Sequence, residues 1–124
     1  MTRRILVLCS GNICRSPIAA ALLACHLSDK TIASAGLAAP VGAPADPMAI
    51  ALAAELGLDL SGHRARHVTL AMCQAADLIL VMEQCHKAEL RRRYPQAWGK
   101  VFRLGEAGGF DIADTAYEPT PLVL

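Results

Sequence analysis

Apolar residues in the first part of the chain form one continuous run, which is followed by a helical segment. The run Arg3–Cys9 is apolar from its third residue onward, which is typical of a strand buried on both faces. Pro17–Leu27 is rich in helix formers, Pro17 suits the first helical position, and Ser16 is placed to cap the helix. The pattern predicts a strand, a polar loop and a helix, in that order.

The rest of the chain alternates in the same way. We expect a strand over Thr31–Ser34, a loop over Gly36–Ala45, a helix that opens at Asp46-Pro47 and stops near Gly57, a short helix around Leu70–Ala75, a strand over Asp77–Met82, a helix over Gln84–Tyr94 and a last strand over Lys100–Leu104. This alternation predicts the α/β class: a small doubly wound domain with a four-stranded parallel sheet flanked by helices. With 124 residues, 54% of them hydrophobic, the chain suits a single domain over 1–124.

Charge and hydropathy argue against two classes of partner. The net charge is only +1, so the strong positive field of a nucleic-acid-binding protein is absent. Every apolar run is shorter than the roughly 18 residues that span a bilayer, and Ile5–Leu8 is too short for a signal peptide, so we expect a cytoplasmic protein without membrane insertion. The basic run Arg91–Arg93 is interpreted as a solvated helix face, with a docking patch for an acidic partner as the alternative.

Five cysteines are present and none forms a C-x-x-C pair, so a disulfide framework is not expected and at least one thiol is predicted to be functional. Cys25, Cys73 and Cys85 are assigned to core or helix positions. No zinc-ligand spacing relates these cysteines to His26, His67 and His86. We therefore expect no metal and no other cofactor.

The loop after the first strand has the composition of an anion-binding site. In parallel sheets, ligands bind at the carboxyl ends of strands, where backbone N–H groups and helix N-termini point outward. Gly11 allows close approach of the backbone, Asn12 tolerates a left-handed conformation, and Arg15 adds a planar fork for two phosphate oxygens. Cys9, at the base of this loop, is expected to be a thiolate and therefore a nucleophile for phosphoryl transfer.

The spacing from Cys9 to Arg15 and Ser16 matches the C-x5-R-S/T signature of cysteine-dependent phosphatases. The string LCSGNICRSP at residues 8–17 resembles the low-molecular-weight protein tyrosine phosphatases specifically. The likeness continues to about Asp114 through SAG at 34–36, ADP at 45–47, SGHRAR at 61–66 and DLILVME at 77–83. It is closest to bacterial members that act on tyrosine autokinases of capsule and exopolysaccharide export.

The resemblance implies a role for each residue of the loop. Cys9 corresponds to the nucleophile, Arg15 to the phosphate-binding arginine, and the Ser16 hydroxyl to the group that stabilises the thiolate. The implied phosphate-binding residues are Ser10, Gly11, Asn12, Ile13, Cys14, Arg15 and Ser16, and the implied supporting network is Asn12, Ser34 and His63.

Two loop positions keep more than one interpretation. Cys14 corresponds to a cysteine that forms a reversible disulfide with the nucleophile in the family, but a small packing residue is the alternative. Ile13 resembles tyrosine-specific members, whereas relatives that act on phosphoarginine tend to carry threonine; Ile13 as a packing residue is again the alternative.

The resemblance also implies a general acid, an aspartate near the C-terminus of the family that corresponds here to Asp114. The family's following proline is Thr115 in this chain, and Asp111 is a competing candidate. The family continues for roughly another helix, whereas prolines and the end of the chain follow here, so we expect that helix to be missing and a homodimer to be an open alternative.

Substrate and reaction follow from the same resemblance. Leu37 and Tyr117 are predicted to form walls of the entrance, and the predicted partner is a phosphotyrosine protein, with a bacterial tyrosine autokinase as the candidate. An arsenate reductase of the same fold is less favoured, because it needs a thiol pair near the end of a later strand and Cys73 and Cys85 flank residues 77–82 at opposite ends. A weakly active or non-catalytic phosphate-binding module is the third alternative.

Overall fold

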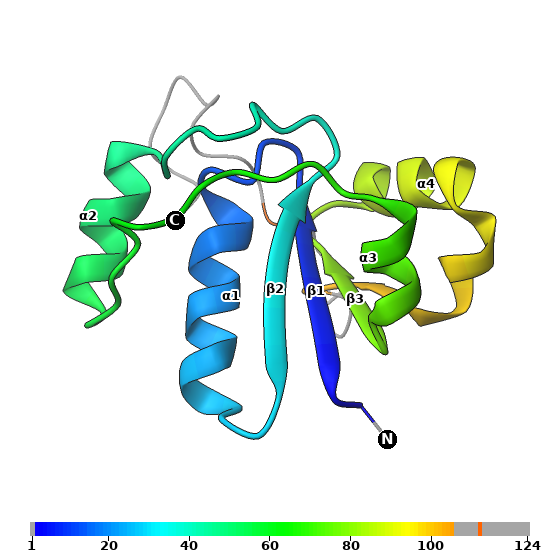
Figure 1. Ribbon diagram of the computed structural model, residues 1–124, viewed down its shortest axis with the longest axis horizontal. Helices are drawn as coiled ribbons and strands as arrows, with labels where there is room; N and C mark the ends of the chain where they lie inside the picture. Colours follow the sequence, from blue (N-terminus) through cyan, green and yellow to red (C-terminus); the bar gives the residue numbers. More distant parts are fainter. Residues whose placement is uncertain (1, 106–111, 113–124) are drawn as a thin grey trace.

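A parallel sheet forms the centre of the molecule, whose computed structural model describes residues 2–105 and 112. Its strands are β1 (Arg4–Cys9), β2 (Thr31–Gly36), β3 (Leu78–Val81) and β4 (Val101–Arg103), in the spatial order β2-β1-β3-β4 (Figure 1). Cys9 of β1 is in register with Gly36 of β2, and Leu8 with Val81 of β3. The carboxyl ends of the three strands therefore meet at one edge, and the predicted fold class is confirmed.

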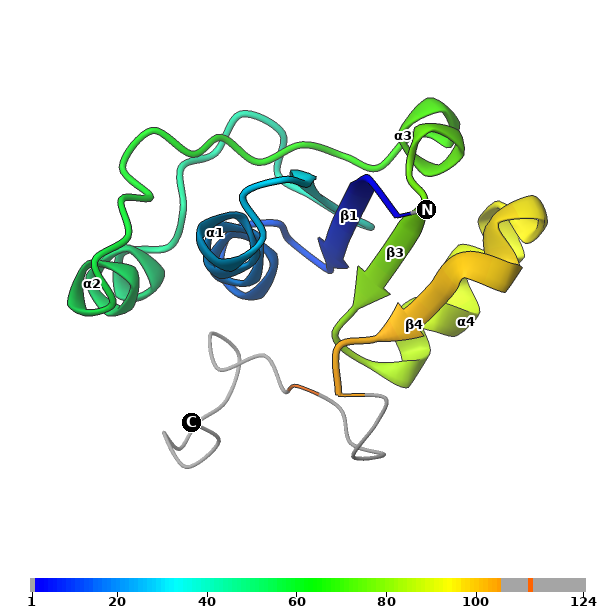
Figure 2. The same ribbon diagram turned by 90° about the horizontal axis from the view of Figure 1, so that it is seen from below.

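Helices cover both faces of the sheet. They are α1 (Arg15–His26), α2 (Pro47–Glu55), α3 (Leu70–Ala75), α4 (Gln84–Arg93) and a 3-10 helix, η1 (Pro95–Lys100). Figure 2 shows α1 against one face, with α2 beyond it, and α3 and α4 against the other face. Within the described part of the chain, no helix is long and apolar enough to cross a membrane.

Alternate side chains of β1 pack into the two hydrophobic clusters on opposite faces of the sheet. Ile5, Val7 and Cys9 belong to the cluster that includes Ala19 of α1, and Leu6 and Leu8 belong to the cluster beneath α3 and α4. All five side chains are at most 5% exposed. A strand buried on both faces has to be apolar at consecutive positions, which explains the continuous run in the sequence. Cys9 therefore lies on the α1 face of the sheet.

Several predicted boundaries differ by one or two residues from the observed ones, two of these differences affect the loop, and one element was not predicted. The first helix begins at Arg15 with Cys14 at its N-cap, so Ser16 lies in the first turn and does not cap the helix. β2 extends to Gly36 because its parallel pairing with β1 continues to the end of both strands. The 3-10 helix η1 begins at Pro95, where the sequence predicted only the end of α4.

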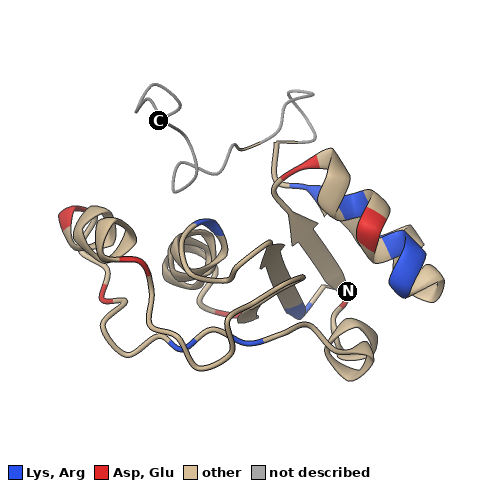
Figure 3. Cartoon of the chain, turned by 90° about the horizontal axis from the view of Figure 1, so that it is seen from above, with Lys and Arg blue, Asp and Glu red and all other residues tan. Residues whose placement is uncertain are grey.

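The basic run at the end of α4 is largely occupied by contacts within the fold. Arg92 and Arg93 each pair with Glu89 at 2.5 Å. The guanidinium of Arg91 stacks over the ring of Trp98, 4.3 Å from its centroid. Figure 3 shows these charges along α4. These contacts favour the interpretation of this run as a solvated helix face.

Candidate active site

The loop between β1 and α1 lies at the carboxyl edge of the sheet, as predicted (Figure 1). Asn12 has a φ of 56°, and its side chain is fully buried. Gly36, at the end of β2, lies directly against this loop: a Cβ atom built on it would be 2.6 Å from the Ser10 carbonyl oxygen. The loop thus needs an asparagine that tolerates the left-handed conformation and a glycine that leaves room for the backbone.

The sulfur of Cys9 receives two polar contacts. The Asn12 N–H donates to Sγ at 3.2 Å, and the Ser16 Oγ lies 3.0 Å from Sγ. The residue is 2% exposed. Both groups can donate a hydrogen bond to sulfur. The geometry therefore directs two hydrogen-bond donors at the buried sulfur at the base of the loop.

Asn12 joins the loop to two distant segments of the chain. Its Nδ2 donates to Ser16 Oγ at 2.8 Å and to Ser34 Oγ at 2.9 Å, and its Oδ1 accepts the Arg66 N–H at 2.9 Å. The His63 Nε2 lies 2.6 Å from the Asn12 carbonyl oxygen. The structure thus brings together the predicted supporting residues Asn12, Ser34 and His63, and it adds the backbone of Arg66.

Arg15 is held from the opposite side of the loop. Its Nη1 donates to Glu83 Oε2 at 2.5 Å and to the Ile112 carbonyl oxygen at 2.7 Å. The Nε and Nη2 atoms of the same guanidinium are buried donors, and the residue is 7% exposed. An ion pair at one nitrogen fixes the plane of the fork, which is what a bidentate contact with a phosphate requires.

His86 connects the other end of the loop to the same carboxylate residue. The Glu83 N–H donates to His86 Nδ1 at 3.1 Å, so Nε2 carries the ring proton and donates to Ser10 Oγ at 2.9 Å. Glu83 and His86 form the capping box of α4. A chain of contacts therefore links the two ends of the loop, running from Ser10 through His86 and Glu83 to Arg15. Sequence reasoning missed Glu83 and His86, although Glu83 follows a predicted strand at its carboxyl end.

The other loop residues lie partly in the core. Cys14 is half-buried and packs against the cluster formed by α2, so its packing role is observed while its redox role stays a prediction. No disulfide joins Cys9 to Cys14 in this structure. Ile13 is half-buried, and its carbonyl oxygen accepts the Asp46 N–H at 2.7 Å, which ties the loop to the start of α2.

The prediction that Leu37 forms a wall of the entrance is wrong. Three other predicted site residues lie outside the described part of the chain. Leu37 is 5% exposed and belongs to the core cluster beneath α3 and α4, because β2 continues past its predicted end and turns this side chain inward. It does not form an exposed wall. Asp111, Asp114 and Tyr117 lie outside the described residues.

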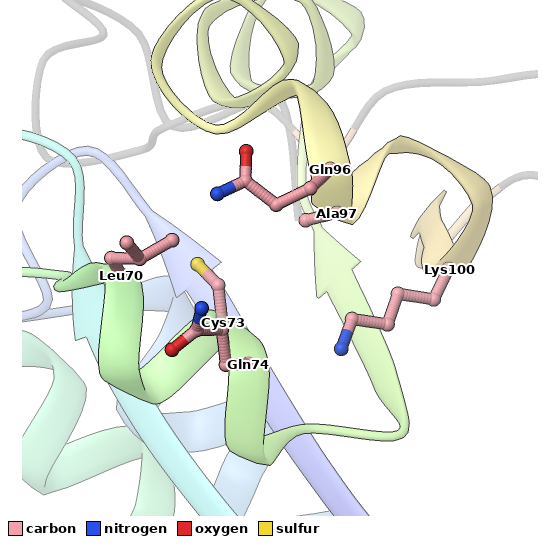
Figure 4. A pocket seen from close by; sticks show the side chains of 6 residues that line it. All are labelled: Leu70, Cys73, Gln74, Gln96, Ala97 and Lys100. Atoms are coloured by element: carbon pink, nitrogen blue, oxygen red, sulfur yellow. The ribbon is translucent and has the colours of Figure 1, made fainter.

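Cys73 and Cys85 lie at opposite ends of β3, as predicted. Cys73 is buried in α3, and burial raises the pKa of its thiol. It lines a pocket of about 170 Å³ between α3 and η1, together with Leu70, Gln74, Gln96, Ala97 and Lys100 (Figure 4). None of these residues belongs to the loop. Cys85 is exposed in the first turn of α4, so the two thiols do not form the pair that an arsenate reductase needs.

Comparison with known proteins agrees with this geometry. The family model described as low molecular weight phosphotyrosine protein phosphatase matches residues 4–114. The chain is 51% identical over 114 residues to the probable low molecular weight protein-tyrosine-phosphatase EpsP of Ralstonia nicotianae, covering 92% of this chain and 79% of that protein. The crystal structure of the tyrosine phosphatase AmsI of Erwinia amylovora superposes with a TM-score of 0.90 at 44% identity, covering 95% of this chain and 79% of that one. Vibrio vulnificus Wzb in complex with benzylphosphonate gives a TM-score of 0.91 at 42% identity, covering 98% and 86% of the two chains.

Proposed function

Because the chain belongs to the low molecular weight phosphotyrosine protein phosphatase family, we propose that it hydrolyses phosphotyrosine in proteins through a cysteinyl-phosphate intermediate on Cys9. The observation that carries the proposal is the position of the Cys9 sulfur. It lies at the base of an anion-binding loop, with the Asn12 N–H and the Ser16 hydroxyl directed at it. A thiolate held in this way is an activated nucleophile.

Two displacements at phosphorus make up the reaction. The Cys9 thiolate attacks phosphorus and forms an S–P bond while the P–O bond to the tyrosine breaks, and the tyrosine oxygen leaves with a proton. Water then attacks phosphorus, the S–P bond breaks, and inorganic phosphate leaves as the thiolate is regenerated. Loop N–H groups and the fork of Arg15 bind the non-bridging oxygens, and they stabilise the charge on them in both transition states.

The leaving oxygen requires an acid. A phenol has a pKa of about 10, so an unprotonated phenolate is a poor leaving group at neutral pH. We assign the proton to Asp114, which corresponds to the family's acid. The family match extends to this residue. Asp111 is the competing candidate.

The substrate is proposed from the relatives. Several are named protein-tyrosine-phosphatases, and the complex of one with benzylphosphonate pairs an aromatic ring with a phosphate-like group. We assign a phosphotyrosine protein as substrate, with a bacterial tyrosine autokinase of exopolysaccharide export as the candidate. Because such a kinase uses ATP, the corresponding site of action is the cytoplasm.

Trapping of the intermediate tests the proposal. During turnover of a phosphotyrosine peptide, rapid denaturation and mass spectrometry should find one phosphate on the fragment that carries Cys9. Cys9→Ser should abolish turnover but still bind inorganic phosphate, since the loop donors remain. Cys25→Ser, which removes an exposed thiol from α1, is the matched control and should behave as wild type.

Three results would contradict the proposal. Turnover of Cys9→Ser near the wild-type rate would exclude the cysteine mechanism. Reduction of arsenate in the presence of thioredoxin, without hydrolysis of the peptide, would favour the reductase. Phosphate binding by the wild type without turnover would favour the non-catalytic module.

A further inference from the structure

A histidine lies on the buried face of α4, where packing favours an apolar residue. His86 and Leu90 are one helical turn apart and are the two buried residues of α4, at 3% and 0% exposure. Leu90 packs into the core cluster beneath α3 and α4. The three other histidines of the chain, His26, His63 and His67, are exposed or half-buried. A buried polar ring is costly unless its nitrogens find hydrogen-bond partners, so the contacts of His86 explain why it is tolerated there.

The two ring nitrogens of His86 contact different parts of the fold. Nδ1 accepts the Glu83 N–H at 3.1 Å, which completes the capping box of α4. Nε2 therefore carries the ring proton and donates to the Ser10 Oγ at 2.9 Å. The first contact lies within the start of α4, whereas the second reaches a residue 76 positions away in the sequence. The second contact acts directly on the phosphate-binding loop.

Ser10 is held from two sides, and this fixes the direction of the N–H group that follows it. Its carbonyl oxygen accepts the Ala38 N–H at 2.8 Å, and its hydroxyl is held by His86. Across a planar trans peptide, the C=O group and the next N–H group point in opposite directions. The Gly11 N–H is therefore turned away from Ala38 and can donate to an anion in the loop.

The contact between Ser10 and His86 is separate from the network around Asn12. The Asn12 side chain holds the loop to Ser34 of β2 and to the backbone of Arg66, whereas Ser10 holds it to α4. Because α4 follows β3, the loop after β1 is held from both strands that flank β1 (Figure 1). Loss of one contact should therefore loosen the first half of the loop and leave the Asn12 network in place.

We propose that His86, as its neutral Nε2-protonated tautomer, is a positioning residue for phosphate. It holds Ser10, and through Ser10 the Gly11 N–H, in the orientation that binds the anion. The competing explanation is that His86 only caps α4 through Glu83. The two explanations can be separated because they use different ring nitrogens. The effect on turnover rests on the proposed phosphatase function; the effect on phosphate binding does not.

Asparagine and glutamine at position 86 separate the two contacts. The asparagine amide branches at Cγ, as the ring does towards Nδ1, so His86→Asn keeps an acceptor for the Glu83 N–H but does not reach Ser10. The glutamine amide lies one bond farther out, so His86→Gln restores a donor near the position of Nε2. Ser10→Ala removes the same hydrogen bond from its other end and leaves the cap of α4 intact. His26→Asn, at an exposed position of α1, is the matched control.

Calorimetric titration of the full-length protein with inorganic phosphate tests the proposal without relying on turnover. His86→Asn and Ser10→Ala should each weaken phosphate binding by about 2- to 12-fold, the range for one neutral hydrogen bond. The double variant should bind no more weakly than the weaker single variant, since both changes remove one interaction. His86→Gln should bind phosphate more tightly than His86→Asn, and His26→Asn should match wild type. The values of kcat/KM with an aryl phosphate should follow the same order.

Two further measurements separate positioning from capping. Urea unfolding should find His86→Asn as stable as His86→Gln, since both keep an acceptor for the cap. Nitrogen-15 NMR of histidine-labelled protein, with His86→Gln to identify the signals, should find the His86 proton on Nε2 near neutral pH.

Several outcomes would overturn the positioning role. These are additive losses in the double variant, unchanged phosphate binding by Ser10→Ala, or a His86 proton on Nδ1. If His86→Asn does not fold, Ser10→Ala still decides, because it does not touch the cap. A wild type that binds phosphate but does not turn over an aryl phosphate, with the affinities in the expected order, would overturn only the phosphatase function.

Discussion

The guanidinium of Arg15 and the carboxylate of Glu83 form an ion pair at 2.5 Å across the edge between α1 and α4. Arg15 belongs to the phosphate-binding loop, and Glu83 follows β3 on the neighbouring strand. The Arg15 side chain is buried at 6% exposure, and the Glu83 side chain is partly exposed at 28%. Removing Glu83 would leave the charge of Arg15 buried without this partner, which is costly. The ion pair therefore holds Arg15, and with it the loop, in place.

Glu83→Ala should weaken both phosphate binding and turnover, because Arg15 loses the contact that orients its fork. A hydrogen bond to a charged group is worth about 1.5–3 kcal/mol, so we expect a loss of roughly 10- to 100-fold in kcat/KM. Glu83→Gln, which keeps an acceptor, should recover part of this loss. Glu89→Ala, which breaks exposed pairs farther along α4, should change kcat/KM by less than about twofold. Equal effects of the two alanine variants would contradict a positioning role for Glu83.

Asn12 should contribute to stability in two separable ways. Asn12→Gly removes three side-chain hydrogen bonds, at about 0.5–1.5 kcal/mol each, but accepts a φ of 56° without strain. Asn12→Ala loses the same bonds and adds about 1–2 kcal/mol for a left-handed alanine. Urea unfolding of both variants measures the difference. An alanine variant as stable as the glycine variant would show that the loop relaxes to another conformation.

Asp114→Asn should lower the rate with phosphotyrosine by about 10²- to 10⁴-fold and should have much less effect with an aryl phosphate whose leaving group is already acidic. The reason is that only a basic leaving oxygen needs the proton. Asp111→Asn is the control and should be close to neutral with both substrates. If Asp111→Asn shows the dependence on leaving group instead, the acid is assigned to the wrong aspartate.

Cys14 should protect Cys9 from irreversible oxidation. Mild peroxide converts the Cys9 thiolate to a sulfenic acid, the Cys14 thiol displaces water from it, and a disulfide results that a thiol reductant reopens. Cys14→Ser should therefore lose activity that the reductant does not restore, because oxidation proceeds to the sulfinic acid. Full recovery of this variant would leave Cys14 with its packing role alone.

Low pH should remove the contribution of the Asp77 carboxylate to the stability of the fold. Its Oδ2 accepts the N–H groups of Arg3 and Arg4, at 2.8 and 2.9 Å, and these hydrogen bonds lower the pKa of the carboxyl group. A carboxyl group with a lowered folded-state pKa stabilises the fold above its unfolded value of about 3.9 and loses that contribution as the pH falls through the folded value. The Tm difference between wild type and Asp77→Asn should thus be constant near neutral pH and shrink below about pH 4. Asp29→Asn, at an exposed carboxylate beside Lys30, is the control. An unchanged difference at acidic pH would contradict the role of Asp77.

Sequence patterns predicted the parts of the site that are contiguous in the chain. The buried strand, the polar loop and the helix formers identified Cys9 and Arg15, since each signal is local. Glu83 and His86 were missed because they reach the loop through the order of the strands, which places β3 beside β1. Leu37 was misplaced for a related reason: its burial depends on the cluster formed by α3 and α4, which no local pattern encodes.

The prediction for Ser16 failed because a local pattern does not include contacts made by the folded loop. A serine before a proline at the start of a helix satisfies the local rule for a cap. Its hydroxyl instead contacts Cys9 and Asn12, because the loop folds back over the first turn of α1. Local preference was overridden by the network that holds the sulfur.

The conformation of the loop depends on Gly36, a residue of the adjacent strand that has no side chain. With the Ser10 carbonyl oxygen 2.6 Å from where a Cβ would stand, a single methyl group on β2 would have to lift the backbone beside Cys9. The neighbouring strand thus acts as a spacer that sets how closely the loop backbone after Cys9 can approach β2. Variation at position 36 is therefore limited by the space that the backbone of Ser10 and the side chains of Ala39 and Asn12 leave beside the strand.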